Sequence, residues 1–258
     1  MKILIAGTGN VALALGKAFT GAGHTLIGIT GRDAVKTGIA ASKLNTAAFP
    51  GFSKLPLSAD LIVIAVKDDA IADVVKRLPS FRGTVVHTSG STPMELLKKF
   101  KRHGVLWPVA TIPKPRKGQF TKVPFVIESN HEKSTTLLMQ AVHSLSGETY
   151  LLDSEQRKVL HLAAVVVNNF TNYLLTVAED ILRKESLPFE ILHKLSESTV
   201  QNAFKAGAKV SQTGPARRND HKTMDLHLKY LAGNKDYARL YRMISELITR
   251  VHKEQVKS

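Results

Sequence analysis

Residues 2–12 read KILIAGTGNVA, an apolar run that ends in a glycine-containing turn. The run Lys2–Ala6 is short and mostly aliphatic, which is typical of a strand buried on both faces of a parallel sheet. Directly after it, Gly7 and Gly9 with the small Ala12 form the pattern G-x-G-x-x-G/A. A strand, this turn and a following helix together predict a unit that binds a dinucleotide.

Each position of the turn has a physical role in such a unit. The first glycine permits the tight bend, the second lets a pyrophosphate approach the backbone, and the small third residue lets helix and strand pack closely. Amide groups at the start of the helix donate to the phosphates. We therefore expect the cofactor to contact Gly7, Thr8, Gly9, Asn10 and Val11. The alternative is a glycine-rich turn that holds no nucleotide.

The end of the second expected strand distinguishes the two nicotinamide cofactors. An NAD site usually carries an acidic residue there, which holds the ribose 2′-hydroxyl. This chain has Gly31 and Arg32 at that place, with Asp33 following. An arginine fork can bind a 2′-phosphate, which favours NADP. NAD stays possible, because a shifted register could bring Asp33 to the ribose.

The first part of the chain alternates between apolar runs and helical patterns, which predicts an α/β fold with a doubly wound, mostly parallel Rossmann sheet. The further strands that we expect are Thr25–Thr30, Leu61–Val66, Thr84–His87, Val105, Phe125–Ile127 and Thr149–Leu152. The helices that we expect are Val11–Thr20, Asp69–Arg77, Pro93–Phe100 and Glu132–Leu145.

The pattern changes near Asp153, after which the sequence is helical almost throughout. The expected helices are Glu155–Lys184, Phe189–Ala206, Asp220–Ala232 and Asp236–Lys253. We therefore predict a dinucleotide-binding domain over residues 1–153 and an all-α domain for substrate binding and dimerisation over residues 154–258.

Ligands of open α/β sheets bind at the carboxyl ends of the strands, so the residues that follow each strand are candidates for the site. Ser89 and its neighbour Thr88 could instead cap a following helix, and His87 could be a packed core residue. The cofactor contacts expected after two of the strands are Val66, Lys67, Asp68, His87 and Ser89.

Four segments carry a resemblance to a known family: residues 65–71 (AVKDDAI), residues 86–91 (VHTSGS), His161 with Asn169, and residues 213–220 (TGPARRND). The chain resembles oxidoreductases that join a Rossmann-like domain to a helical domain of unknown function. This family is related to pyrroline-5-carboxylate reductase and to deazaflavin-dependent NADP reductases. The resemblance runs over nearly the whole chain and implies a nicotinamide cofactor, a small-molecule substrate and a homodimer.

Two positions depart from the family's usual pattern. Trp107 precedes Pro108 where the family often has a histidine, which removes one possible proton donor or substrate ligand. Asn219 stands between Arg218 and Asp220 where the family often has glycine.

Reduction of a carbonyl or imine by hydride transfer requires a proton donor, and His161 is our candidate. It lies in an apolar helical run together with Asn168 and Asn169, which helical spacing keeps near its face. Buried polar residues need partners, so these side chains could instead form hydrogen bonds between helices or across a dimer. Asp220, elsewhere in the chain, could orient an arginine or His221. The expected catalytic residues are His161, Asn169 and Asp220.

A Gly-Pro turn followed by arginines is the second candidate cluster. Its arginines could bind an anionic substrate or the cofactor phosphates. The alternative for Asp220 is a helix cap. The expected substrate contacts are Ser89, Pro108, Thr213, Gly214, Pro215 and Arg218.

Composition excludes several classes of protein. The chain has no cysteine, which excludes disulfides and thiolate chemistry and fits the cytoplasm, where we expect the protein. No histidine spacing typical of a metal site is present. We expect neither a signal peptide nor a membrane span. The net charge of +15 is spread widely, which favours a solvated basic surface over a nucleic-acid site.

Three functions are compatible with these residues. The first is reduction of a small, anionic carbonyl or imine compound with NADPH. The second is a non-catalytic NADP-binding redox sensor or regulator, whose basic surface could bind nucleic acid. The third is reduction of NADP by a second redox cofactor such as a deazaflavin. Fold class does not decide among them.

Overall fold

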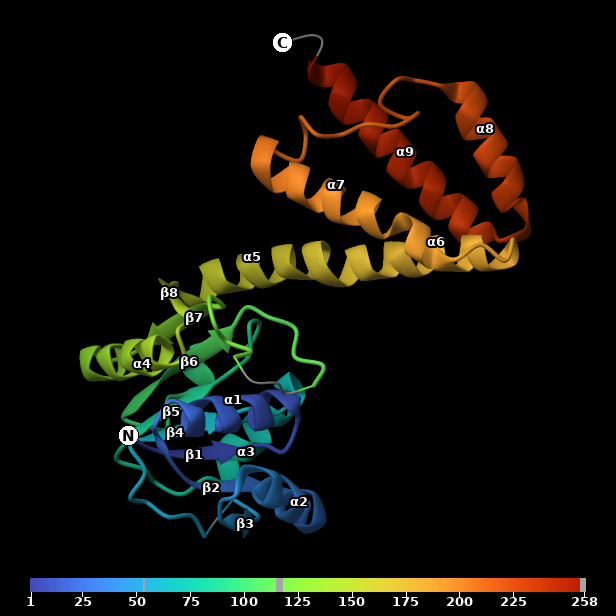
Figure 1. The fold of residues 1–258 in the computed structure, drawn as a ribbon. Helices are drawn as coiled ribbons and strands as arrows, with labels where there is room; N and C mark the ends of the chain where they lie inside the picture. Colours follow the sequence, from blue (N-terminus) through green and yellow to red (C-terminus); the bar gives the residue numbers. More distant parts are fainter. Residues whose placement is uncertain (53, 115–117, 256–258) are drawn as a thin grey trace. The chain divides into compact units, whose positions relative to one another are not determined.

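The structure is a computed structural model that describes residues 1–52, 54–114 and 118–255 of the 258-residue chain. Contacts divide it into two compact units, Met1–Asn168 and Asn169–Ser258. Figure 1 labels the helices and strands of both units.

The first unit is built on an eight-stranded sheet with the order β3-β2-β1-β4-β5-β6-β7-β8. Neighbouring strands run parallel except for the antiparallel pair β6 and β7. This arrangement confirms the expected doubly wound, mostly parallel Rossmann sheet. The strands are β1 (Lys2–Ala6), β2 (Thr25–Gly31), β3 (Ala48–Pro50), β4 (Leu61–Ile64), β5 (Thr84–His87), β6 (Arg102–Pro108), β7 (Pro124–Ser129) and β8 (Glu148–Leu151).

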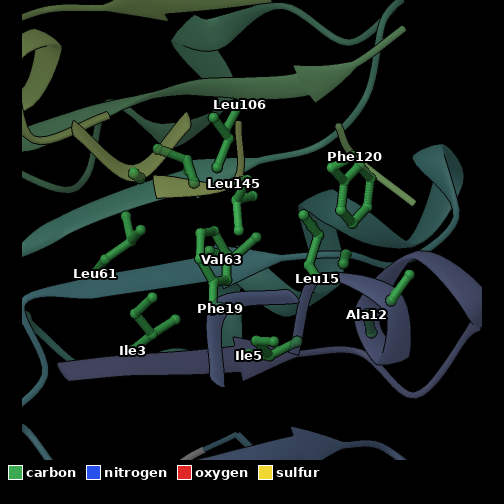
Figure 2. Packing of buried hydrophobic residues seen from close by; sticks show 14 of the residues in the cluster. Ile3, Ile5, Ala12, Leu15, Phe19, Leu61, Val63, Leu106, Phe120 and Leu145 are labelled. Carbon is green, nitrogen blue, oxygen red and sulfur yellow. The ribbon is translucent and has the colours of Figure 1, made fainter. Parts of the chain in front are cut away.

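Helices connect these strands and cover the sheet. They are α1 (Asn10–Gly21), α2 (Ala34–Leu44), α3 (Ile71–Arg77), α4 (Glu132–Ser144) and α5 (Ser154–Ala164), with short 3-10 turns at Asp68–Ala70 and Met94–Leu97. Successive side chains of a strand point to opposite faces, so each central strand contributes to two cores. One core contains Ile3, Ile5, Leu61 and Val63 with Leu15 and Phe19 of α1 (Figure 2). The other contains Leu4, Ala6, Ile62 and Ile64 with Ile71 and Val74 of α3.

The second unit is helical, as the sequence predicts. It contains α6 (Thr171–Lys184), α7 (His193–Ala206), α8 (His221–Tyr230) and α9 (Lys235–Gln255), with 3-10 turns at Phe189–Leu192 and Leu231–Gly233. A π-helical segment, Val165–Phe170, joins α5 to α6. The helix expected over Glu155–Lys184 is therefore present but interrupted by a wider turn. The domain boundary was expected near Asp153, which is the N-cap of α5. Contacts instead place α5 in the first unit, which ends at Asn168.

One expected element is wrong and two were not expected. The helix expected over Pro93–Phe100 is only a 3-10 turn at Met94–Leu97, in which amides bond to carbonyls three residues earlier. The elements not expected are α2 and the short strand β3.

Candidate functional site

The turn after β1 contains two glycines with different structural requirements. Gly7 has a φ of 140°, and a Cβ atom there would lie 2.1 Å from the Ala65 carbonyl oxygen. The fold itself therefore requires glycine at this position. Gly9 is exposed and extended, and a Cβ atom there would meet nothing within 4 Å. Packing does not require glycine at position 9, but close approach of a ligand would.

The start of α1 is arranged to receive an anion. Gly9 is the N-cap, no side chain caps the helix, and its first turn has no acidic residue. The amides of this turn are therefore available to phosphate oxygens, and the helix dipole favours negative charge there. Asn10 donates its side-chain amide to the Pro113 carbonyl at 2.5 Å, so that side chain holds a neighbouring loop. Thr8 lies against Gly31, where a Cβ atom would be 2.8 Å from the Thr8 methyl carbon.

At the end of β2, the acidic candidate Asp33 and the basic candidate Arg32 have different surroundings. The Asp33 carboxylate accepts the Lys36 amide at 3.0 Å and is the N-cap of α2. Arg32 is exposed. The residue that could have held an NAD ribose is thus engaged by its own helix, while the guanidinium beside it faces solvent.

The loops after β4 and β5 are bonded to each other. The Ser91 hydroxyl donates to the Asp68 carboxylate at 2.7 Å. The Ser89 hydroxyl accepts the amides of Ser91 and Thr92 at 3.2 and 3.0 Å. Ser89 therefore shapes the loop after β5 (residues 88–93, the β5 loop) from within and does not cap a helix, since the following 3-10 turn at Met94–Leu97 has no side-chain cap. Val66 and Lys67 lie beside Asp68 after the end of β4.

His87 is fully buried at the end of β5. The Ser89 amide donates to its Nδ1 atom at 3.2 Å, so the neutral ring carries its proton on Nε2. That Nε2 atom is the one buried side-chain nitrogen or oxygen without a hydrogen-bond partner in the part of the chain that is described. Burial, followed by the positive charge of Arg157, lowers the pKa of His87 from 6.5 to about 4.

This depressed pKa predicts an acid-sensitive contribution to stability. The folded state favours neutral His87, so the stabilisation is complete above pH 6.5 and is lost as the pH falls through about 4. The loss should amount to about 3 kcal/mol of unfolding free energy. We expect His87→Asn, which keeps an acceptor for the Ser89 amide, to lack this component in urea unfolding at neutral pH and at about pH 4. Identical pH dependence in variant and wild type would contradict the expectation.

His161 lies against the β5 loop. A Cβ atom on Gly90 would be 2.5 Å from His161 Cδ2 and 2.7 Å from Trp107 Cε2. The rings of His161 and Trp107 are 5.7 Å apart between centroids and tilted by 49°. The tryptophan that departs from the family pattern thus packs against the proposed proton donor, and Gly90 makes room for both rings. Pro108, next to Trp107, is buried at the end of β6.

Arg157 is a residue of this region that the sequence did not reveal. It is fully buried, and its guanidinium bonds to the β5 loop and to Glu128. It lies four residues before His161 on α5, so both side chains project from one helix face. That spacing is the only sequence signal for it, because its partners are far away along the chain.

The second unit contains the other candidate cluster. Gly214 has a φ of 103°, and Asn219 has a φ of 53°, a left-handed conformation that asparagine tolerates better than most residues. This conformation explains how asparagine can replace the family's usual glycine. Thr213 and Arg218 are exposed, and Pro215 is half-buried. The segment is held to α9 by the Thr249 hydroxyl, which donates to the Ala216 carbonyl at 2.9 Å.

Asp220 is the N-cap of α8. It accepts the Thr223 amide at 3.1 Å and the Thr223 hydroxyl at 2.7 Å, and these bonds lower the pKa of its carboxyl. Asn168 and Asn169 lie in the π-helical segment, and such segments occur frequently at functional sites. The catalytic roles of Asp220 and Asn169 stay predictions. Among the described residues, no group of histidine and acidic side chains could hold a metal ion.

Two domain models match the chain. Residues 1–113 match the model of a Rossmann-like domain, and residues 123–248 match the model described as a domain of unknown function, DUF2520. A comparison with curated proteins finds no match.

Solved structures are similar over almost the whole chain. A Bacteroides fragilis protein named as a candidate NADP oxidoreductase is 31% identical, with a TM-score of 0.87, covering 96% of this chain and 98% of that one. Pyrroline-5-carboxylate reductase from Streptococcus pyogenes is 16% identical, with a TM-score of 0.65 and coverage of 97% and 98%. The Aspergillus terreus reductive aminase, solved with NADPH and ethyl levulinate, is 16% identical, with a TM-score of 0.69 and coverage of 98% and 94%.

The similarity to the Streptococcus pyogenes and Aspergillus terreus enzymes, at 16% identity, shows a shared fold. The similarity to the Bacteroides fragilis protein and the two domain matches show the family. The chain belongs to the family of proteins that join a Rossmann-like domain to a DUF2520 domain.

Proposed function

We propose that this protein is an NADPH-dependent reductase that transfers hydride to a small, anionic carbonyl or imine compound. The observation that carries the proposal is the open turn at Gly9. Packing does not require glycine there, and the first amides of α1 have no side-chain cap and are free to bind an anion. The similar proteins named above as an NADP oxidoreductase and as reductases support the same reading.

Preference for NADPH rests on the end of β2. Asp33 is occupied as the N-cap of α2, which leaves the exposed Arg32 to bind the 2′-phosphate. The Aspergillus terreus enzyme was solved with NADPH, which agrees with this choice.

Exchange of Arg32 for alanine should reduce affinity for NADPH about 10-fold and leave affinity for NADH unchanged, because only NADPH carries the 2′-phosphate. Fluorescence titration of both cofactors against wild type and variant measures the two ratios. Lys36→Ala, an exposed cation on the first turn of α2, is the matched control. Equal losses for both cofactors, or no loss for NADPH, would contradict the assignment of Arg32.

In the chemistry that we propose, a residue of the first unit donates the proton that the reduced substrate takes up. NADPH, when bound, supplies a hydride to the substrate carbon. The oxygen or nitrogen of the reduced bond then needs a proton, and His161 is the half-buried imidazole beside the β5 loop that could donate it. Gly90 and Trp107 hold the ring in place by packing.

The anionic character of the substrate rests on Arg218. It is exposed in the segment that Thr249 and Asp220 order, and a guanidinium binds a carboxylate through two parallel hydrogen bonds. A compound that carries a carboxylate is therefore the substrate class that we propose.

We also propose that the protein is a homodimer. The helical run Ser154–Lys184 is long and apolar enough, by length and composition, to cross a bilayer. Its side chains Val159, Leu162 and Val167 are 69%, 64% and 62% exposed. Apolar side chains as exposed as these mark an interaction surface, and we propose that a second copy of the chain covers them. Sedimentation equilibrium of the full chain distinguishes dimer from monomer.

A further inference from the structure

The guanidinium of Arg157 binds three backbone carbonyls of the β5 loop. Its Nη1 atom donates to the carbonyl oxygens of Ser89, Gly90 and Thr92 at 3.3, 3.0 and 2.8 Å. These acceptors lie more than sixty positions earlier in the chain than the arginine. One side chain thus fixes the path of almost the whole loop.

The other side of the guanidinium binds β7 and the start of α5. Nε and Nη2 donate to the Glu128 carboxylate at 3.2 and 2.8 Å, and Nη2 also donates to the Ser154 hydroxyl at 3.0 Å. The Ser154 hydroxyl in turn donates to Glu128 at 2.8 Å. The Arg157 side chain is 0% exposed and that of Glu128 is 10% exposed, so the two charges compensate each other away from solvent.

A buried ion pair of this kind is weak evidence for stability. Transferring both charges out of water costs much of the free energy that their attraction supplies. A protein with an apolar pair of similar volume in their place is often as stable. The pair instead supplies directional geometry. Arginine carries five N–H donors in a rigid plane, and a lysine ammonium in the same place could not reach the loop carbonyls and the carboxylate together.

The loop that Arg157 holds also contacts the candidate site. Gly90 presses against His161 and Trp107. Ser91 bonds to Asp68 at the end of β4. These residues follow the carboxyl ends of β4 and β5, which in open α/β sheets border the bound ligand. The turn at Gly9, where the pyrophosphate is expected, has none of these contacts with Arg157.

We propose that Arg157 is a positioning residue, which holds the β5 loop in the shape that receives the nicotinamide end of NADPH. The proposal rests on the proposed function. Arg157 itself touches neither cofactor nor substrate and acts through the carbonyls of Ser89, Gly90 and Thr92. The pyrophosphate and the 2′-phosphate are bound elsewhere, by the Gly9 turn and Arg32.

The test compares two ligands on the full-length chain. NADPH carries the nicotinamide, and 2′-phospho-ADP-ribose has the same phosphates without it. Arg157→Lys keeps the positive charge beside Glu128 but removes the planar fork. We expect this variant to bind NADPH about tenfold more weakly than wild type. It should bind 2′-phospho-ADP-ribose as tightly as wild type, whereas a general structural defect would weaken both.

A second variant removes the risk of an uncompensated charge. Arg157→Met combined with Glu128→Gln eliminates both members of the pair and should show the same selective loss for NADPH. The matched control is Arg77→Met with Asp73→Asn, because both members of that ion pair lie on α3 and are about half exposed. The control should bind both ligands as wild type does.

The chain also contains its own reporter, since Trp107 is its only tryptophan and lies against Gly90. A displaced loop should shift Trp107 emission to the red in both Arg157 variants and not in the control. Equal loss of both ligands, or unchanged NADPH binding in both variants, would overturn the proposal. If wild type binds neither ligand, the proposed function fails instead.

Discussion

Exchange of Gly9 for asparagine should weaken NADPH binding about 100-fold, or by about 2.7 kcal/mol, without lowering the stability of the free protein. In the free protein a Cβ atom at this position meets nothing within 4 Å. Gly9 is also the N-cap of α1, a position where asparagine is favoured over glycine by a few tenths of a kcal/mol, roughly. The added side chain would occupy the space through which the pyrophosphate approaches the helix amides.

This substitution is a sharp test because stability and NADPH affinity are expected to change in different directions. Thermal unfolding should show an equal or slightly higher midpoint, and titration should show the loss of affinity. Gly21→Asn is the matched control, because Gly21 lies in the last turn of the same helix and also has open space around it. Retained NADPH affinity in Gly9→Asn would show that no nucleotide approaches this turn.

Exchange of His161 for asparagine should lower kcat on the order of 100- to 10,000-fold, the usual contribution of a positioned proton donor. NADPH affinity should be unchanged, since His161 is expected to act on the substrate. A panel of keto acids and cyclic imines with NADPH supplies the substrate for this measurement. Keto acids should show the larger loss, because an imine can bind already protonated.

His143→Asn is the control for this prediction. His143 is an exposed histidine near the end of α4 in the same unit, so the same change there should leave kcat unaltered. A kcat within about twofold of wild type in His161→Asn would exclude this residue as the proton donor.

The elements with continuous apolar runs could be predicted closely from sequence. Strands β1 and β5 have the predicted bounds, Lys2–Ala6 and Thr84–His87, because each is a short run centred on branched aliphatic residues, which is typical of buried strands. Helix α2 has no such signal. Two of its three large apolar residues, Val35 and Ile39, are 72% and 52% exposed, while its buried face consists of Leu44, Thr37 and two alanines.

In the candidate site, too, some residues could be predicted from local sequence and others could not. The roles of Gly7 and Gly9 follow from local backbone geometry, which a short sequence pattern records. The roles of Arg157 and Glu128 depend on bonds between β7, α5 and the β5 loop, and no local pattern predicts those bonds. Asp33 and Asp220 show the converse difficulty, because helix capping and ligand binding select the same residue types at the same positions.

Calorimetric titration of the wild-type chain with NADPH and with NADH tests the central claim most directly. We expect NADPH to bind one site per chain in the micromolar range and NADH to bind at least about tenfold more weakly, as ordinary cofactor affinities and the lost 2′-phosphate imply. Absence of heat or saturation with both cofactors would contradict the account, since the open turn at Gly9 would then have no nucleotide to receive.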